Sequence, residues 1–406
     1  MSLVVPALTV EDALARVVDG TVPLAATERV GLLAATGRVL AAPLLAKQTQ
    51  PPFNASAMDG YAVRAADLAA LPATLRVIGE SAAGHGYRGP FGAGDAVRIF
   101  TGAPIPPGAD AIIIQENTSR EGDRVVVRDG EIDPTFIRPT GGDFSVGAIG
   151  ITAGHRLTAR DITLAAAMGH AQLVVRRRPS VAILATGDEL VLPGQTPALD
   201  QIVCSNIFGI AAMVAAAGGE PRLLGIARDT HADLAAHVDE AAGADILVTV
   251  GGASVGDHDL VAPVLKARGM ALDFWKIAMR PGKPLMSGKL GAQRVLGLPG
   301  NPVSSLVCTR LFLVPLVRAL QGLRPELNSA LLAQTAVPLP ANGPRAHYMR
   351  ATARPGADGR LDVKLVRSQD SSLLTPLAEA DCLIVRPIRA PAVAAGATVP
   401  IMMLDF

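Results

Sequence analysis

Three carboxylates stand in polar loops that directly follow short apolar runs of the chain: Glu189, Asp229 and Asp259. Each one alone is more typical of a helix cap or an ion-pair partner than of a metal ligand. A few hard carboxylate oxygens, completed by phosphate oxygens, are nevertheless how proteins usually hold Mg²⁺. Together with glycine-rich and cationic loops nearby in the fold, the three carboxylates predict a metal–phosphate site with Mg²⁺ as the cofactor.

A glycine-rich loop precedes the third of these carboxylates. It contains Gly251, Gly252, Ser254 and Gly256, and an expected helix follows it. Glycines let backbone N–H groups approach a phosphate closely, a serine hydroxyl adds a donor, and the positive end of a helix favours an anion. The alternative is a tight turn in which Asp259 is the N-cap of the helix. Phosphate binding is the interpretation that we favour.

Two further loops suit an anionic ligand. The two prolines around the glycine of Pro299–Pro302 make a rigid loop that another molecule can approach closely. Asn301 as an N-cap and Pro302 at the first helical position would equally make an ordinary helix start. Arg280 and Lys283 place two cations on a stiff turn, which suits an oxyanion, although solvated surface charges would give the same pattern.

Residues 179–328 contain the elements that must position these loops. Apolar runs and expected helices alternate along this stretch: 181–186, 202–217, 222–227, 231–241, 245–250, 259–268 and 294–298. Such an order predicts a doubly wound, mostly parallel α/β sheet, in which ligands bind beyond the carboxyl ends of the strands. Because the polar loops follow strands, the fold would gather them at one edge. Their convergence is more specific than any single motif.

The rest of the chain predicts three more parts. Residues 1–45 and 140–178 are expected to form a helical N-terminal domain. Residues 46–139 have short β-type runs between Gly- and Pro-rich turns, which predicts a small β domain inserted into the helical one. Residues 329–406 are again β-rich and are expected to form a barrel-like domain. The expected fold class is therefore multidomain, α/β plus β.

Composition argues against several other classes of protein. The net charge of the 406 residues is +1, which gives no bulk reason to expect nucleic-acid binding. Cys204, Cys308 and Cys382 form no CxxC pair, which disfavours a zinc cluster or a disulfide framework and suits a reducing cytoplasm. No signal peptide is visible, and the longest apolar run, Ile207–Ala217, is too short for a membrane span. We expect a cytoplasmic protein without nucleic-acid or membrane partners.

Six motifs follow one another in a fixed order over nearly the whole chain: Ser56–Ala62, Thr101–Pro104, Thr186–Leu190, Gly251–Gly256, Pro281–Pro284 and Leu298–Ser304. In this order they resemble the MoeA family, which includes the catalytic E domain of gephyrin. Two departures from the family pattern stand out. Arg280 replaces the Lys of many members, which keeps the charge but offers a bidentate fork. Asn54 and Ala55 replace a common Asp-Asn pair in a loop that tolerates variation.

The resemblance implies a four-part subunit that forms a homodimer. It also implies a transferase of molybdenum cofactor biosynthesis, which inserts molybdenum from molybdate into adenylylated molybdopterin and releases AMP. A transient contact with the molybdopterin adenylyltransferase is expected as well. Matching positions imply functional polar residues at Asp59, Thr101, Asp143, Glu189, Asp229 and Asp259.

The candidate substrate-binding residues come from the loops and from the resemblance together. They are Gly251, Gly252, Ser254, Gly256, Arg280, Lys283, Pro299, Gly300, Asn301, Pro302, Ser304, Arg350 and Ser371. Lys283, Ser304, Arg350 and Ser371 are implied on the molybdate and pterin side, and the motifs that carry the last two are looser. As a hypothesis, the three strand-end carboxylates hold Mg²⁺ at the pyrophosphate link, while Arg280, Lys283 and Arg350 hold molybdate beside the dithiolene sulfurs.

Two rival functions stay open at this stage. The same α/β domain type resembles molybdopterin adenylyltransferases, but these are typically single-domain proteins. The Asp59 motif and the β-rich C-terminal region argue against that function. A receptor-clustering scaffold, as gephyrin is, goes with an additional domain and a long linker, and neither is visible in this sequence. The molybdenum-inserting enzyme is therefore the function that we favour.

Overall fold

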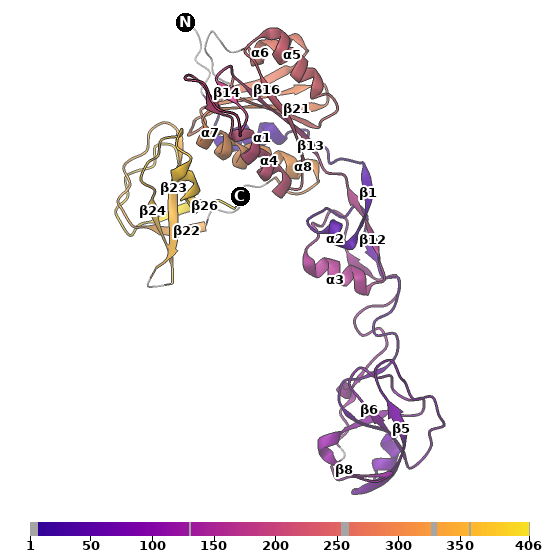
Figure 1. Cartoon of the computed structure of the whole chain (residues 1–406). Helices are drawn as coiled ribbons and strands as arrows, with labels where there is room; N and C mark the ends of the chain where they lie inside the picture. Colours follow the sequence, from indigo (N-terminus) through magenta and orange to yellow (C-terminus); the bar gives the residue numbers. More distant parts are fainter. Residues whose placement is uncertain (1–6, 130, 253–259, 326–330, 357–358, 406) are drawn as a thin grey trace. The chain divides into compact units, whose positions relative to one another are not determined.

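The computed structural model describes residues 7–129, 131–252, 260–325, 331–356 and 359–405. The chain folds into two compact units, Met1–Glu28 with Arg176–Phe406, and Arg29–Val175. Figure 1 labels many of the elements of both units.

A six-stranded sheet forms the centre of the first unit. In spatial order its strands are β16 (Glu220–Ala227), β13 (Ser180–Thr186), β17 (Ile246–Val250), β21 (Gln293–Leu298), β20 (Pro284–Leu290) and β18 (Ala271–Lys276). The first four are parallel, whereas β20 and β18 run antiparallel to their neighbours. The expected doubly wound, mostly parallel sheet is confirmed.

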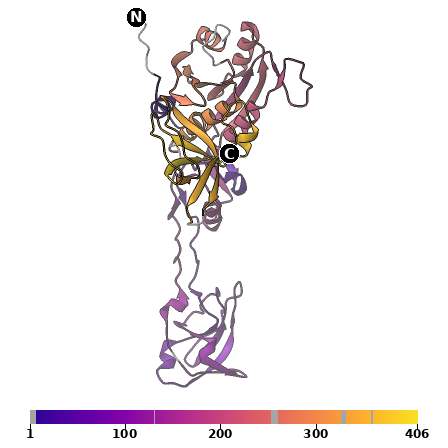
Figure 2. The same cartoon turned by 90° about the vertical axis from the view of Figure 1, so that its left-hand side faces the viewer.

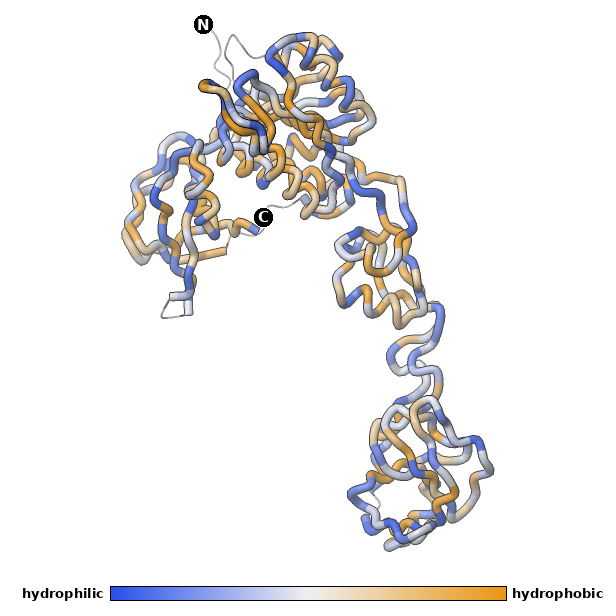
Figure 3. Tube along the Cα trace, viewed as in Figure 1, coloured by the Kyte–Doolittle hydropathy of each residue, from blue (hydrophilic) through white to orange (hydrophobic). Residues whose placement is uncertain are grey.

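Helices cover both faces of this sheet (Figure 1). Val181, Ile183 and Ala185 of β13 share one buried cluster with α1 (Val10–Val18), α4 (Asn206–Ala216), α7 (Pro302–Cys308) and α8 (Val314–Leu320). Ala182 and Leu184 share the other cluster with α5 (His231–Glu240) and α6 (Val261–Ala267). Successive side chains of a strand point to opposite faces, so a strand covered on both sides must be apolar throughout. The hydrophobic colouring of these elements is visible in Figure 3.

A long apolar helix passes through the core of this unit. α7, a π-helical turn η4 (Thr309–Leu313) and α8 form the stretch Pro302–Leu320, which is long and apolar enough to cross a membrane. The share of its most apolar window that is buried inside the structure is 83%, so it packs as a core helix. Arg310 and Arg318 interrupt this stretch, so its uninterrupted apolar runs are shorter than the run Ile207–Ala217.

The C-terminal part of the first unit is a closed barrel. Its strands follow the order β23 (Ala346–Pro355), β24 (Leu361–Leu365), β22 (Leu331–Thr335), β26 (Thr398–Met403) and β25 (Cys382–Arg386), and β25 pairs back with β23. Figure 2 shows these orange and yellow strands. A short strand of the α/β region, β19 (Met279–Arg280), adds to β23 in parallel. The expected barrel-like domain is confirmed.

The second unit begins and ends in a small mixed α and β part. Here β1 (Thr27–Gly31) pairs with β12 (Gln172–Arg176), and β2 (Leu44–Leu45) pairs with β11 (Ile149–Ile151). The helices of this part are the single-turn α2 (Leu32–Ala35) and α3 (Ala159–Ala167). The expectation of helix in the first 45 residues is therefore confirmed at α1 and wrong for residues 19–45. Gly31 and Gly37 bracket α2, and Gly37 has a φ of +75° that ends the turn.

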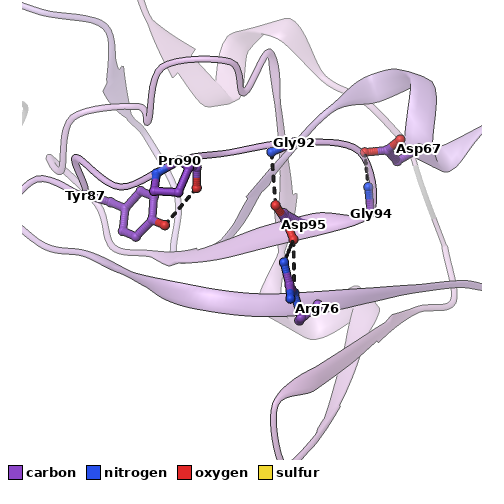
Figure 4. A network of polar contacts seen from close by, with 7 residues as sticks. All are labelled: Asp67, Arg76, Tyr87, Pro90, Gly92, Gly94 and Asp95. Carbon is purple, nitrogen blue, oxygen red and sulfur yellow. Dashed lines mark hydrogen bonds and ion pairs between the residues drawn. The ribbon is translucent and has the colours of Figure 1, made fainter.

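The other part of the second unit is a curled sheet, as expected for the inserted β domain. Its strands follow the order β7 (Ala111–Ile114), β4 (Gly60–Val63), β6 (Asp95–Ile99), β5 (Ala73–Ser81), β9 (Arg124–Val127) and β8 (Thr118–Glu121). β5 and β6 are parallel, so the chain must travel back along the sheet between them. Side chains fix the end of that connection (Figure 4): Asp95 accepts from Arg76 and from the backbone of Gly92, and Asp67 accepts from Gly94.

Helix α3 begins at a small polar cluster. Asp161 accepts hydrogen bonds from the backbone N–H of Thr158, at 2.7 Å, and from its hydroxyl, at 2.6 Å. His155 lies 3.0 Å from the same carboxylate. Burial raises the pKa of Asp161, but the hydrogen bonds from Thr158 and His155 outweigh this and lower the pKa to about 2.

Replacing Asp161 by Asn should therefore destabilise the second unit. We expect a loss of about 1–2 kcal/mol in the free energy of unfolding at pH 7. Because the folded-state pKa lies below the unfolded one, the charge-dependent share is present above pH 4 and disappears as the pH falls toward 2. Urea unfolding of both proteins at pH 7 and pH 3 measures this. A difference of the same size at both pH values would contradict the role of the charge.

Candidate functional site

A cavity of about 930 Å³ opens at the carboxyl ends of β13 and β17. It brings together many of the residues that the sequence singles out: Glu189, Asp229, Gly251, Gly252, Pro299, Gly300, Asn301, Pro302 and Ser304. The predicted convergence of separate polar loops on one edge of the sheet thus holds for these residues. Such an edge is where open α/β sheets bind ligands.

Glu189 owes its position to a glycine two residues earlier. A Cβ atom built on Gly187 would lie 2.2 Å from Oε2 and 2.7 Å from Oε1 of Glu189, so the carboxylate folds back over the glycine. The φ of Gly187 is +146°, a backbone conformation that residues with a side chain rarely adopt. Gly187 is thus needed both for the turn and for the place of the carboxylate.

Asp229 is held by Asp188, the residue that precedes Glu189. Oδ1 of Asp188 accepts the backbone N–H of Asp229 at 3.2 Å. The carbonyl of Asp188 also accepts from the Arg228 guanidinium at 3.2 Å. The loops after β13 and β16 are therefore tied together, which keeps the Glu189 and Asp229 carboxylates beside one cavity.

The glycine-rich loop differs in one respect from what was expected. The N–H of Gly251 donates to the carbonyl of Leu298 at 3.1 Å, which continues the ladder of β17 and β21. Gly251 therefore allows a ligand to come close to the backbone, but its N–H does not donate to a phosphate. Ser254, Gly256 and Asp259, three of the predicted site residues, lie outside the described residues.

The Pro299–Pro302 loop links three elements at the cavity. Asn301 occupies the N-cap position of α7, with Pro302 at the first helical position, but its side chain makes no capping bond. Nδ2 of Asn301 instead donates to Oγ of Ser371 at 3.1 Å. The carbonyl of Gly300 accepts from Nδ2 of Asn206, at the start of α4, at 2.7 Å.

Arg350 is buried and forms hydrogen bonds with a loop of the barrel. Its side chain donates to the carbonyls of Asp370, at 2.9 Å, and Leu373, at 3.2 Å. Its backbone exchanges two hydrogen bonds with the Gln369 amide. With only 1% of the residue exposed, Arg350 holds the segment that presents Ser371 to α7. A direct contact between Arg350 and molybdate stays a prediction.

Arg280 and Lys283 lie on a turn that packs against α7. Gly282, between them, has a φ of +103°, and a Cβ there would lie 2.5 Å from Sγ of Cys308. Both cations are exposed, and Arg280 donates to Oδ1 of Asn342 at 3.3 Å. They do not line the cavity, although Pro284 of the same turn does.

His347 lies opposite Arg280 in the pairing of β19 with β23. Burial, together with the positive charges of Arg280, Arg345 and Arg350, lowers its pKa from 6.5 to about 4. The ring is therefore neutral at pH 7, and this end of the barrel has an excess of positive charge. Such a surface suits an oxyanion.

Asp59, Thr101 and Asp143 belong to the second unit. Oδ1 of Asp59 accepts from the N–H and the hydroxyl of Thr101, at 2.7 and 2.8 Å. These two hydrogen bonds, followed by the nearby Arg98 charge, outweigh desolvation and hold the pKa of the exposed Asp59 carboxyl below its usual value. Asp143 is exposed, and its N–H donates to the carbonyl of Gln50. Asp59 and Thr101 thus form a pair, and their function stays a prediction.

Thr186, Cys204 and Asn206 also line the cavity, and none of them was a predicted site residue. Ser205 and Asn206 are polar residues that open an apolar helix beyond a strand end, a signal that could have pointed to them. Burial raises the pKa of the Cys204 thiol, and the Glu189 charge raises it further despite a hydrogen bond from Ile207, so the thiol stays neutral.

The chain matches three family profiles. Residues 8–169 match "MoeA N-terminal region (domain I and II)", residues 182–319 match "Probable molybdopterin binding domain", and residues 333–404 match "MoeA C-terminal region (domain IV)". This chain belongs to the MoeA family. The resemblance inferred from the six motifs is confirmed.

Similar proteins cover nearly the whole chain. A molybdopterin molybdenumtransferase of Nostoc sp. is 37% identical over 390 residues, which is 94% of this chain and 89% of the relative. One from Haemophilus influenzae is 35% identical over 381 residues, 92% of this chain and 93% of the relative. The crystal structure of a molybdopterin biosynthesis MoeA protein from Pyrococcus horikoshii has a TM-score of 0.84 at 28% identity, covering 99% of this chain and 100% of that one.

Replacing Gly187 by Ala should displace the Glu189 carboxylate, because the new Cβ would overlap it. Because Glu189 is a predicted Mg²⁺ ligand, we expect the affinity of the chain for Mg²⁺, measured by calorimetry in the presence of AMP, to fall by about tenfold or more. Gly194→Ala is the matched control, since Gly194 also has a positive φ but has nothing within 4 Å of a Cβ. Both variants should lose stability, and only Gly187→Ala should lose affinity. Unchanged affinity in Gly187→Ala would contradict the positioning role.

The low pKa of His347 predicts a pH-dependent stability. Between about pH 6.5 and 4 the unfolded chain takes up a proton at this residue that the folded chain does not, so stability falls as the pH falls through this window. His347→Gln removes this proton uptake. Its melting temperature should therefore drop less between pH 7 and pH 5 than that of the wild type. Identical slopes in a thermal unfolding series would show that His347 is not the source.

Proposed function

We propose that this chain inserts molybdenum from molybdate into adenylylated molybdopterin and releases AMP in a Mg²⁺-dependent reaction. Relatives that carry the name molybdopterin molybdenumtransferase match 94% and 92% of the chain, which supports this activity. The observation that carries the proposal is one cavity lined by Glu189, Asp229, Gly251, Gly252 and Gly300. A metal-assisted reaction at a phosphate needs these groups in one place.

Mg²⁺ fits the donors that the cavity offers. Glu189 and Asp229 supply hard carboxylate oxygens, and Asp259 would be the third. In the part of the chain that the structure describes, no three metal-ligating side chains form a cluster. Phosphate oxygens and water would complete the shell, as is usual for Mg²⁺. When bound, the cation would neutralise charge on the pyrophosphate link and on the departing AMP.

The chain's own residues would mainly position the two reactants. The rigid Gly300 loop, fixed by Asn206, would hold the nucleotide part of the substrate in the cavity. Arg280 and Lys283 would bind molybdate, a tetrahedral dianion, on the turn anchored to Cys308. Ser304 lines the cavity from α7 and would donate to the substrate from between these regions. Holding reactants in place lowers the entropic part of the barrier.

A homodimer is part of this proposal. The second unit exposes a group of large apolar side chains around β2 and β11, with Leu45, Val146 and Ile149 exposed by 48%, 65% and 62%. Leu45 and Ile149 are direct partners in the β2–β11 pairing, so they form one patch. Contiguous apolar patches on a surface are typical of protein interfaces.

The proposal extends to the location of the protein and to a further partner. We place the protein in the cytoplasm, because Cys204, Cys308 and Cys382 are all buried free thiols, which suits a reducing compartment. The adenylyltransferase that makes the adenylylated pterin would be the transient partner. If this chain were instead that adenylyltransferase, it would release pyrophosphate from ATP and molybdopterin in the absence of molybdate. A receptor-clustering scaffold would bind receptor loops and catalyse neither reaction.

Anaerobic incubation of the full chain with adenylylated molybdopterin, Mg²⁺ and molybdate tests the activity. AMP release should depend on molybdate, and Glu189→Gln and Asp229→Asn should each slow it by about a hundredfold. Glu240→Gln, which changes an exposed carboxylate at the end of α5, is the control and should leave the rate unchanged. AMP release that does not require molybdate would overturn the proposed function.

A further inference from the structure

Thr186 carries a buried hydroxyl that makes no hydrogen bond within the described structure. It is the last residue of β13, it lines the cavity, and only 6% of it is exposed. Its Oγ1 has no hydrogen-bond partner among the residues that the structure describes. Buried polar atoms in native proteins are almost always paired, so an unpaired one at a cavity wall indicates a missing partner.

Two glycines lie directly beside this hydroxyl, where a larger residue would crowd it. A Cβ on Gly251 would lie 3.0 Å from Oγ1 and 2.7 Å from the carbonyl oxygen of Thr186. A Cβ on Gly252 would lie 3.1 Å from Oγ1. Both glycines have positive φ values, +94° and +56°. The glycines of the loop thus form a cradle whose floor is the threonine side chain.

The chemistry of the surroundings selects the ligand. The Gly251 N–H is already used by the carbonyl of Leu298, so it cannot donate to a ligand. The Thr186 hydroxyl is therefore a group of this cradle that can donate a hydrogen bond to a ligand. Glu189 follows three residues later and lines the same cavity. A phosphate oxygen carries negative charge and accepts hydrogen bonds. It can therefore bind a divalent cation held by carboxylates and accept a hydrogen bond from a hydroxyl group at the same time.

We propose that the Thr186 hydroxyl donates a hydrogen bond to a phosphate oxygen of the nucleotide part of the substrate. The inference rests on the proposed function for the identity of that nucleotide. Thr186 is then a substrate-positioning residue, and the glycine loop acts by exposing it.

The chain contains a matched control in the neighbouring strand. Thr249 of β17 pairs with Leu184 of β13, is fully buried, and also has no partner for its hydroxyl among the described residues. It does not line the cavity, and Gly297 lies beside it, with a Cβ position 3.3 Å from Oγ1. Thr186 and Thr249 thus share burial and chemistry and differ in access to the cavity.

Calorimetric titration of the full chain with AMP, in the presence of Mg²⁺, tests the inference. Thr186→Val should weaken AMP binding by about tenfold or more, since a hydrogen bond to a charged group is lost. Thr186→Ser keeps the hydroxyl and should bind AMP within about threefold of the wild type. Thr249→Val should bind AMP as the wild type does. Binding of adenosine, which lacks the phosphate, should be equal in the wild type and Thr186→Val.

Thermal unfolding without ligand separates this role from a structural one. Because Val removes an unpaired buried hydroxyl, both Val variants should keep or raise the melting temperature. AMP binding by Thr186→Val equal to that of the wild type would overturn the inference, as would an equal loss for adenosine or no AMP binding by the wild type. AMP release that does not require molybdate would overturn the proposed function, whereas the binding measurements test only the role of Thr186. The two failures are therefore distinguishable.

Discussion

The parallel pairing of β13 with β17 is the constraint on which the cavity depends. Ala185 lies opposite Val250 at the end of this pairing, so the residues that follow, Thr186 and Gly251, are brought side by side. The register is set by buried apolar side chains on both faces of the two strands, and a slip by one residue would turn each side chain to the other face. The same pairing fixes where the loops that carry Glu189 and the glycines begin. Local chemistry at the edge is thus decided by packing in the core.

The sequence predicts this edge well because the signal is regular. Continuous apolar runs followed by polar loops identify β13, β16 and β17 and the loops that hold Glu189, Asp229 and Gly251. In contrast, residues 19–45 contain a single turn of helix at α2 and two short strands where helix was expected. In that region single residues and long-range pairing with β11 and β12 outweigh local propensity. The sequence of a short apolar segment does not show which distant strand it will pair with.

Side-chain direction is the part of the site that composition does not reveal. Asn301 has the sequence context of an N-cap, yet its amide reaches Ser371, 70 residues away. Arg350 has the charge expected of an anion ligand, yet it is buried against carbonyl groups of the barrel loop. Both outcomes depend on where a distant loop lies, which no local pattern encodes. The residue types were predicted, and their roles follow from the tertiary fold.

The contact between Asn301 and Ser371 has a consequence for the exchange of domains between relatives. The carbonyl of Ser371 also accepts the N–H of Val303, so the barrel loop supplies part of the cap of α7 that a side chain would otherwise supply. A chimera that grafts the barrel of another relative onto this α/β domain would need a loop of matching length and backbone path. Otherwise the first turn of α7 would be left without an acceptor. The barrel loop and the helix that it completes are therefore structurally interdependent.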